Sequence, residues 1–242
     1  MQSVLQTQSM HMILMEVFIP VGQILKGMGA SMTKLFSYVV TRDYGFAPNP
    51  FHSYCTLATC KPQIRKHANV GDWVVGTTSV AIGSRHGSKP MLLYWMKVSE
   101  ILTFQQYWSD TRFQVKKPML NGSKKMAYGD NIYHQTSSGV WMQSNSHHTY
   151  PDGSINRENL STDTGQTNNV LISNEFVYMG ENPLPIPPSV ANHQGVALAK
   201  KGAGHKSSAF NASFISNFEN WHYNFYCLGN APMGFQNKPS DW

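Results

Sequence analysis

Side chains suited to proton transfer gather in one polar stretch of the sequence. Asp130 begins this stretch, and the adjacent His147 and His148 follow it. Histidine is the side chain most often used as a general acid or base near neutral pH, and a carboxylate commonly assists it. If the protein is an enzyme, we expect its catalytic residues to be His147, His148 and Asp130.

The same residue types are also metal ligands. Neighbouring residues of an extended strand point to opposite faces, so a shared ion would require the chain to fold back through a turn. We predict no metal ion and no cofactor. A hairpin that buries one histidine is the structural alternative.

Cysteine offers a second route to catalysis. The chain has three cysteines, a low and odd number that excludes a disulfide scaffold. Cys55 with a histidine and either Asp43 or Asp130 would make a thiol nucleophile set, and Lys61 would favour the thiolate of Cys60. The spacing does not fix the distance between any of these groups.

The loop at 42–59 combines aromatic and polar side chains, as a base pocket requires for stacking and for hydrogen bonds to the base edge. The glycine-rich string at 201–206 could hold a phosphate on its backbone amides. The alternative is that the rings pin the loop to the core. The predicted base- or nucleic-acid-binding residues are Phe46, Asn49, Phe51, Tyr54, Thr56, Asn131, Tyr133, Trp141 and Lys206.

Apolar periodicity predicts the elements that must position these residues. Thr103 and Gln106 form a capping box at the start of a helix. Aromatic residues at steps of three and four after position 207 predict an amphipathic helix, capped by Ser207 or Ser208 and ending near Gly229. We expect strands at 35–41, 73–76, 91–102, 130–134 and 170–179, a short helix at 62–69, a polar hairpin loop at 84–89 and a loop at 144–166.

The composition agrees with a protein rich in strands and loops. Of the 242 residues 41% are hydrophobic and 13% are charged, against about a quarter charged in ordinary soluble domains. The element order predicts an α+β class: a small, mixed, partly closed β-barrel with short flanking helices and a C-terminal amphipathic helix. The net charge of +6 is compatible with nucleic acid, and the absence of a long basic block excludes a disordered basic tail.

The first 31 residues differ from the rest of the chain. They are rich in methionine, and Glu16 and Pro20 interrupt their apolar stretch, so we expect neither a membrane span nor a signal peptide. The segment is either a short accessory helix or the product of an upstream start codon, and we favour the second interpretation, in which Met32 starts the evolved protein. We expect a cytoplasmic location with reduced thiols. The predicted division is an extension at 1–31, a barrel domain at 32–182, and at 183–242 a proline-rich connector with an aromatic helix that packs on the same domain.

Long strings of the sequence resemble the nucleotide modification associated domain family, type 2. They are SYVVTRDYGFAPNPFHSYCTLATCKPQIRKHANVGDWVVGT at Ser37–Thr77, ILTFQQYWSDTRFQVKKPMLNG, GDNIYHQ with the later Trp141, SHHTYPDGS, and NNVLISNEFVYMG. A looser similarity, in Gly71-Asp72 and in Lys97–Ile101, is to PUA-like folds, including the ASCH and EVE domains. The PUA-like similarity implies a pseudobarrel that takes a flipped base into an aromatic pocket.

The family resemblance implies a role in nucleic-acid modification or phage–host conflict. We therefore expect the protein to bind a modified nucleotide base, free or within DNA or RNA. The resemblance implies nucleotide or nucleic-acid partners and an association with DNA-modification enzymes, and we expect no membrane partner. Two alternatives remain open: an enzyme that modifies or removes a base with a His/Asp pair, and a protein-interaction module that docks through the aromatic helix.

Overall fold

The computed structural model describes residues 32–79, 82 and 89–242. Thr33–Trp242 form one compact unit. The expectations for residues 1–31 and for nearly all of the hairpin loop at 84–89 lie outside the described residues, so they stay predictions, as does the division of the chain into three segments.

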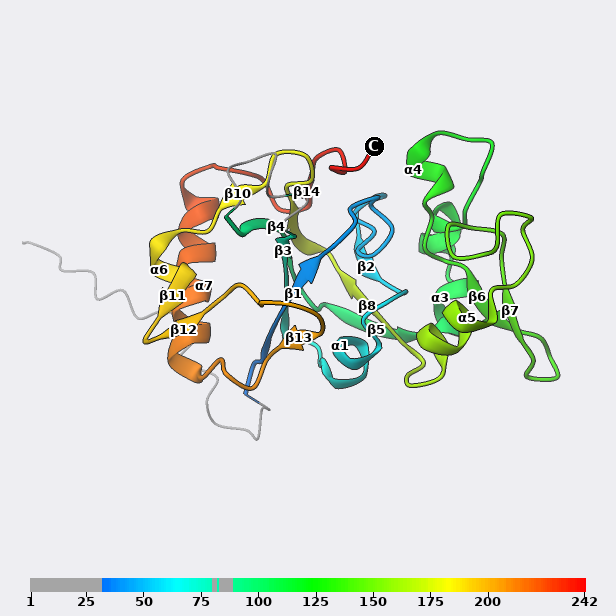
Figure 1. Cartoon of the computed structure of the whole chain (residues 1–242), viewed down its shortest axis with the longest axis horizontal. Coiled ribbons are helices and arrows are strands. Elements are labelled where there is room, and N and C mark those ends of the chain that lie inside the picture. Colours follow the sequence, from blue (N-terminus) through cyan, green and yellow to red (C-terminus); the bar gives the residue numbers. More distant parts are fainter. Residues whose placement is uncertain (1–31, 80–81, 83–88) are drawn as a thin grey trace, which may run out of the picture. The chain divides into compact units, whose positions relative to one another are not determined.

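A mixed sheet forms the centre of this unit (Figure 1). β1 and β3 are parallel, which the intervening chain at 41–72 allows, while β4 is antiparallel to both β3 and β9. The strands, in sheet order, are β13 (His205–Lys206), β1 (Leu35–Val40), β3 (Trp73–Thr78), β4 (Met91–Lys97), β9 (Glu175–Tyr178) and β14 (Phe235–Gln236), with β10 (Leu184–Pro185) also pairing with β4.

A second sheet consists of β2 (Cys55–Leu57), β8 (Asn169–Ser173) and β5 (Glu100–Thr103). The continuous strands predicted at 91–102 and 170–179 are each divided in two. The first passes from the first sheet to the second, and the other passes from the second sheet to the first. The breaks face each other: the Ser99 hydroxyl donates to Asn174 Oδ1 at 2.6 Å, and Asn174 N–H donates to Ser99 Oγ at 3.1 Å. Side-chain hydrogen bonds there replace the ladder and let both strands bend together.

The predicted α+β class is confirmed. In the part of the chain that the structure describes, the strands form separate sheets and no ring of hydrogen-bonded strands closes. The partly closed PUA-like barrel therefore stays a prediction.

The helix α7 (Ala212–Cys227) covers one face of the first sheet (Figure 1). Phe218 is fully buried, and its ring meets Trp73 edge-on with the centroids 5.3 Å apart. Trp221 is partly buried against Trp95, so the face that would have docked a partner is turned inward. The short elements α6 (Pro188–Ala191), β11 (Asn192–His193) and β12 (Val196–Ala197) lie beside α7.

The predicted end of this helix near Gly229 is confirmed, since Gly229 follows the C-cap Leu228 with a φ of 68°, but the predicted N-cap is wrong. Asn211 is the N-cap, and its side chain accepts a hydrogen bond from Phe214 N–H at 2.9 Å. Ser207 and Ser208 lie too early because the chain first places Phe210 against Phe214, with ring centroids 4.6 Å apart. This contact resembles a hydrophobic staple and sets the point at which the helix begins.

On the far side of the second sheet lies a third apolar cluster. It includes Phe104, Tyr107 and Phe113, and the predicted capping box at Thr103 is confirmed. The elements here are α3 (Phe104–Ser109), η3 (Thr111–Lys116), α4 (Lys124–Ala127), β6 (Tyr133–Gln135), β7 (Trp141–Gln143) and α5 (Arg157–Thr164), while α1 (Pro62–His67) contacts β8 and α5 and buries Ile64 in the core of the first sheet.

The helix α5 contradicts the loop predicted at 144–166. Asn156 caps it by accepting from Glu158 N–H and Asn159 N–H, both at 3.1 Å. Asp163 is the buried residue of this helix, so an apolar period could not reveal it. The predicted strand at 130–134 begins later, at Tyr133, because Asp130 and Asn131 are buried in side-chain networks.

Candidate functional site

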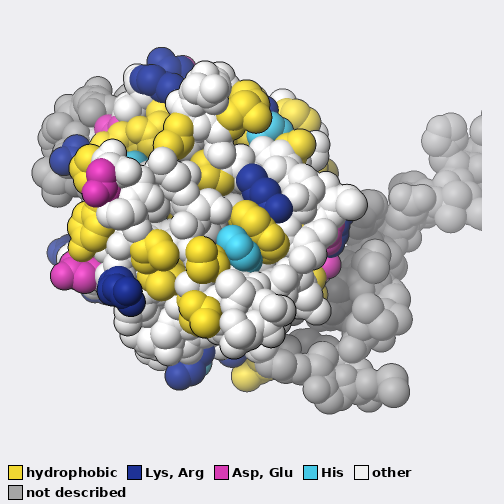
Figure 2. Space-filling model, turned by 90° about the vertical axis from the view of Figure 1, so that its right-hand side faces the viewer, with side chains coloured by type: hydrophobic (Ala, Val, Ile, Leu, Met, Phe, Trp, Pro, Cys, Tyr) yellow, Lys and Arg dark blue, Asp and Glu magenta, His cyan; other side chains and the backbone are white. Residues whose placement is uncertain are grey.

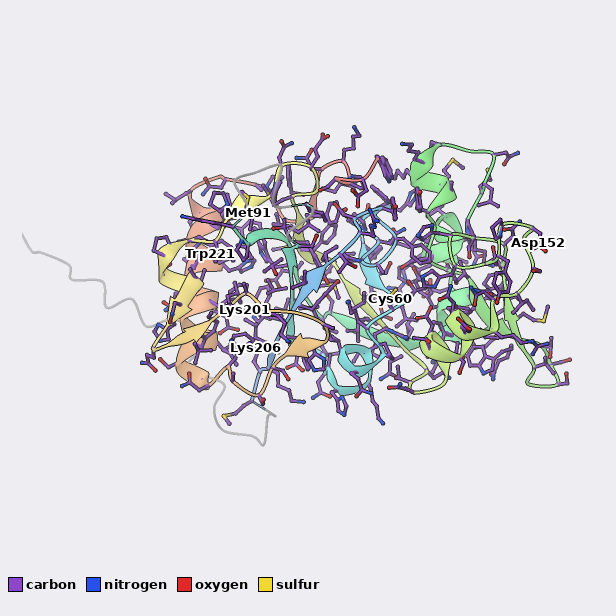
Figure 3. The ribbon with its side chains drawn as sticks, in the orientation of Figure 1. Cys60, Met91, Asp152, Lys201, Lys206 and Trp221 are labelled. Carbon is purple, nitrogen blue, oxygen red and sulfur yellow. The ribbon has the colours of Figure 1, made fainter. Side chains whose placement is uncertain are left out.

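A cleft of about 220 Å³ opens between the first sheet and the group of elements around α5. Three segments line it: the end of β1 with the following loop, the residues before α1, and the loop after β7. Cys60 lies at this position in Figure 3. The lining residues are Tyr38, Val40, Thr41, Arg42, Tyr44, Phe46, Ala47, Cys60, Lys61, His147 and His148.

The charges along this lining have one sign. Arg42 and Lys61 contribute cations, and none of the described lining residues is Asp or Glu. Clefts lined by one sign of charge attract the opposite ion. The cleft therefore favours an anionic ligand.

Cys60 occupies a sharp corner of the backbone. Its φ of 57° and the φ of 43° at Lys61 lie in the left-handed region, which residues other than glycine seldom adopt. Cys60 N–H donates to Asp163 Oδ1 at 2.6 Å, and Cys60 C=O accepts from Arg65 Nε at 2.8 Å. Strained corners held by their surroundings concentrate at functional sites.

His148 joins Cys60 to Asp163. Its Nε2 lies 3.7 Å from Cys60 Sγ, and its Nδ1 lies 2.9 Å from Asp163 Oδ2. Tyr133 donates its hydroxyl to the same carboxylate oxygen at 2.8 Å. A nucleophile, a base within reach and a carboxylate that orients the base form the arrangement of a Cys–His–Asp triad.

Buried hydrogen bonds fix the three triad residues relative to one another. Arg65, on α1, is fully buried and donates to the backbone carbonyls of Cys60 at 2.8 Å and Asp163 at 2.5 Å. The carbonyl of His148 accepts from Asn159 Nδ2 at 2.9 Å. The helix α5 therefore supplies Asp163 and also anchors the histidine loop.

The two adjacent histidines have pKa values shifted in opposite directions. Burial disfavours the charged form of His148, but the hydrogen bonds to Asp163 and Cys60 outweigh it and raise the pKa of His148 to about 9. Partial burial, followed by the charge on His148, lowers the pKa of His147. At neutral pH His148 is therefore protonated and His147 is neutral.

Aromatic rings surround His147. Its ring lies 4.9 Å from Tyr44, 5.3 Å from Phe46 and 5.1 Å from Tyr128, measured between centroids. Tyr44 and Tyr128 stack face to face at 5.2 Å. His147 also lines a second hollow of about 350 Å³, so it stands between two recesses of the surface.

Several predicted site residues lie in a buried network that anchors the aromatic loop. Lys116 donates to Asn49 Oδ1 at 2.7 Å and to Thr56 Oγ1 at 3.1 Å. Asp130 accepts from Thr56 at 2.6 Å and from Tyr107 at 2.7 Å, and neither His147 nor His148 is among its hydrogen-bond partners. Burial raises the pKa of Asp130 and lowers the pKa of Lys116 to about 8.

The other predicted ring residues pack elsewhere. Phe51 contacts Trp242 at 5.4 Å, and Tyr54 contacts Phe113 at 5.3 Å. Trp141 packs against Phe104 with centroids 5.7 Å apart. Of the residues predicted for the site, the cleft brings together Phe46, His147 and His148.

The remaining two polar candidates also lie outside the cleft lining. Asn131 is buried and donates to the carbonyls of Tyr107 and Phe113, both at 3.1 Å. Lys206 lies on β13 and donates to Ala197 C=O at 2.6 Å (Figure 3). Its partner on β1 is Ser37, whereas Tyr38, which lines the cleft, points to the opposite face of the sheet.

Sequence reasoning missed Asp163, Arg42 and Tyr44 as site residues. It considered Cys60 only with Lys61, and it paired the histidines with Asp130. The left-handed corner at Cys60 has no sequence signature. The one indication of α5 was Asn156, an N-cap residue followed by Glu158 in the first turn.

Within the described ranges, no group of three or more His, Cys, Asp or Glu side chains is arranged to hold a metal ion. The described helices include none with both the length and the apolar character needed to cross a membrane.

The comparisons with known proteins give one match. The family model described as nucleotide modification associated domain 2 matches residues 32–242. No curated protein and no solved structure matches the chain.

Proposed function

Because the chain belongs to the nucleotide modification associated domain 2 family, we propose that its cleft binds a modified nucleotide. The nucleotide is free or part of DNA or RNA, in a nucleic-acid modification or phage–host conflict setting. Its base stacks in the aromatic part of the cleft, as in a PUA-like base pocket, and DNA-modification enzymes are its proposed partners. The three free cysteines suit the reducing cytoplasm.

The observation that carries this proposal is the combination of rings and cations in one cleft. Tyr44 offers a ring for stacking, the nearly buried Phe46 supports the wall behind it, and neutral His147 can donate or accept a hydrogen bond at the base edge. Arg42 and Lys61 supply the charge that a phosphate requires. A nucleotide is a ligand that uses both features at once.

The buried residues predicted from the aromatic loop have a different proposed role. Asn49 and Thr56, held by Lys116, shape the loop that carries Tyr44 and Phe46. They position the wall of the pocket and do not touch the base. The same holds for Asn131, which fixes the start of the segment leading to β6.

Isothermal titration calorimetry with the deoxynucleoside monophosphates and their 5-hydroxymethylpyrimidine derivatives tests the proposal. Replacing Tyr44 by Ala should weaken binding by about 1–3 kcal/mol, the cost of one lost stack. Tyr150→Ala is the matched control, because Tyr150 is an exposed ring that is absent from the cleft lining. Arg42→Gln should weaken binding and make it less dependent on salt.

Two outcomes would contradict the proposal. One is that no nucleotide of this panel binds. The other is that Tyr150→Ala weakens binding as much as Tyr44→Ala, which would place the ligand outside the cleft.

A further inference from the structure

We propose that the cleft is also catalytic, with Cys60 as the nucleophile of an acyl-transfer reaction. His148 carries the proton, and Asp163 is the positioning residue that orients His148. The substrate class rests on the proposed function: a nucleotide that bears an acyl group in amide or ester linkage. The base-modifying enzyme predicted from the sequence used His147, His148 and Asp130. The geometry retains His148 from this set and adds Cys60 and Asp163.

The arrangement of the three side chains carries the inference. The imidazole of His148 has both nitrogens engaged, one toward Cys60 Sγ at 3.7 Å and one toward Asp163 at 2.9 Å. The first distance suits a hydrogen bond to sulfur, and such contacts shorten when substrate binds. Cys60 itself lines the cleft, so the sulfur is open to a ligand.

The other two cysteines lack this setting. Cys55 is fully buried on β2, and burial raises its thiol pKa. Cys227 is exposed at the end of α7, on the opposite side of the first sheet from the cleft. The chain therefore contains an enclosed thiol and an exposed thiol against which Cys60 can be compared.

The charged and titratable groups around His148 favour its protonated form. Asp163 accepts from one side of the ring, and Tyr133 and Arg65 hold Asp163 in place. His147, whose ring centroid lies 6.1 Å from that of His148, is neutral at pH 7 and adds no competing charge. His148 Nε2 faces Cys60 Sγ at 3.7 Å, so the proton transferred in the reaction moves between these two atoms.

The reaction balances without an external oxidant or reductant. The Cys60 thiolate forms an S–C bond with the acyl carbon, and the C=O electron pair moves to oxygen. As the pair returns, the C–N or C–O bond breaks, and the leaving group takes the proton from His148. Water then attacks the thioester and gives a proton to His148, the C–S bond breaks, and the carboxylic acid and the thiolate–imidazolium pair are released.

The negative oxygen of this step needs a positive partner. The Cys60 N–H already donates to Asp163, and Pro62 has no N–H. Lys61 lines the same cleft next to the nucleophile. We assign the stabilisation of the oxyanion to its ammonium group.

The test uses p-nitrophenyl acetate as the acyl donor and intact-mass and peptide mass spectrometry as the readout. Wild type should release nitrophenolate and retain one acetyl group on Cys60, which neutral hydroxylamine removes because it cleaves thioesters. His148→Gln should slow acetylation by about 100-fold, the usual contribution of a residue that carries the transferred proton. His134→Gln is the matched control, since it makes the same substitution at a histidine that stacks on Trp108 outside the cleft lining, and it should leave the acetylation rate close to that of wild type.

Asp163→Asn separates positioning from folding. With the fold verified by circular dichroism, this variant should acetylate slowly and lose the dependence of the rate on the protonation of His148. If Cys60 acetylates no faster than Cys227, or if His148→Gln matches wild type, the inference is wrong. Alkylation of Cys60 by iodoacetamide without any acetylation would also overturn it, because a reactive thiol alone is not an acyl-transfer site.

Nucleotide binding and catalysis fail separately in this design. Cys60→Ala should abolish acetylation and leave calorimetric nucleotide binding intact. Tyr44→Ala should weaken nucleotide binding, and in this background His148→Gln should still slow acetylation by about 100-fold. If only the results expected of Cys60→Ala fail to appear, the triad is refuted. If only the results expected of Tyr44→Ala fail to appear, the nucleotide pocket is refuted.

Discussion

At the residue scale, the opposite protonation of His147 and His148 divides two roles between neighbouring side chains. A protonated His148 can hold a thiolate and give its proton to a leaving group, while a neutral His147 can meet the edge of a base. The pattern of two adjacent histidines indicated chemistry but could not assign these roles. Asp163 decides them, and it lies on a helix that the sequence did not predict.

The raised pKa of His148 predicts a pH-dependent stability. The folded-state pKa of about 9 exceeds the ordinary value of 6.5, so the stabilisation is fully present below about pH 6.5 and is lost as the pH rises through about 9. The free energy of unfolding of wild type minus that of His148→Gln should therefore fall by about 3 kcal/mol across this range. Urea unfolding of both proteins from pH 6 to pH 10 measures the difference.

Wild type must be compared with His148→Gln because the titration of Lys116 changes the free energy of unfolding with pH in the opposite direction. Its folded-state pKa of about 8 lies below the ordinary 10.5, so its protonation destabilises the fold at low pH and this effect disappears as the pH rises through that range. A difference between wild type and His148→Gln that is constant with pH would contradict the assigned protonation of His148.

The buried lysine also predicts a large effect on stability. Lys116→Met removes the donor that Asn49, Tyr54 and Thr56 accept from, and it leaves Asp130 without a neighbouring cation, so it should cost about 3 kcal/mol or more in chemical denaturation. Lys117→Met is the matched control. Its ammonium lies over the Trp108 ring, and its loss should cost about 1 kcal/mol or less. Equal losses in the two variants would show that the network does not anchor the loop.

At the element scale, the sequence predicted the strands and helices that bury apolar faces. β1 and β3 were predictable because they are short runs of β-branched and aromatic residues, and α7 because its aromatic residues repeat at steps of three and four. The break of the two long strands at Ser99 and Asn174 was not predicted, since in each strand only a short polar stretch interrupts residues that are apolar again directly after it. The helix α5 was not predictable either, because its buried residue is an aspartate held by tertiary hydrogen bonds.

The burial of each aromatic side chain on α7 predicts how much that side chain contributes to the stability of the protein. Phe218→Ala should destabilise the protein by about 3–5 kcal/mol, because the ring is fully buried against Trp73. Tyr223→Ala on the same helix should change the stability little, since Tyr223 is 63% exposed. Thermal unfolding compares the two. A small effect of Phe218→Ala would contradict the inward orientation of this face.

At the scale of the whole molecule, the positive charge is dispersed. The excess is +6, and lysines and arginines lie singly over the face that carries α4, β6 and β7 (Figure 2). Because no single cationic patch appears on this face, duplex DNA should bind weakly, with an affinity that falls steeply between about 50 and 200 mM salt. Fluorescence anisotropy with a duplex measures this. Tight duplex binding that resists salt would contradict a function centred on the small cleft.

A nucleotide bound in the cleft should cover Cys60, so protection of this thiol from alkylation measures the occupancy of the cleft. Alkylation of Cys60 by iodoacetamide is followed by mass spectrometry with and without the nucleotide that binds most tightly in calorimetry, and Cys227 serves as the reference thiol. At a nucleotide concentration about ten times Kd, we expect the alkylation of Cys60 to be about tenfold slower and the alkylation of Cys227 to be unaffected. Unchanged alkylation of Cys60 under saturating nucleotide would contradict the account.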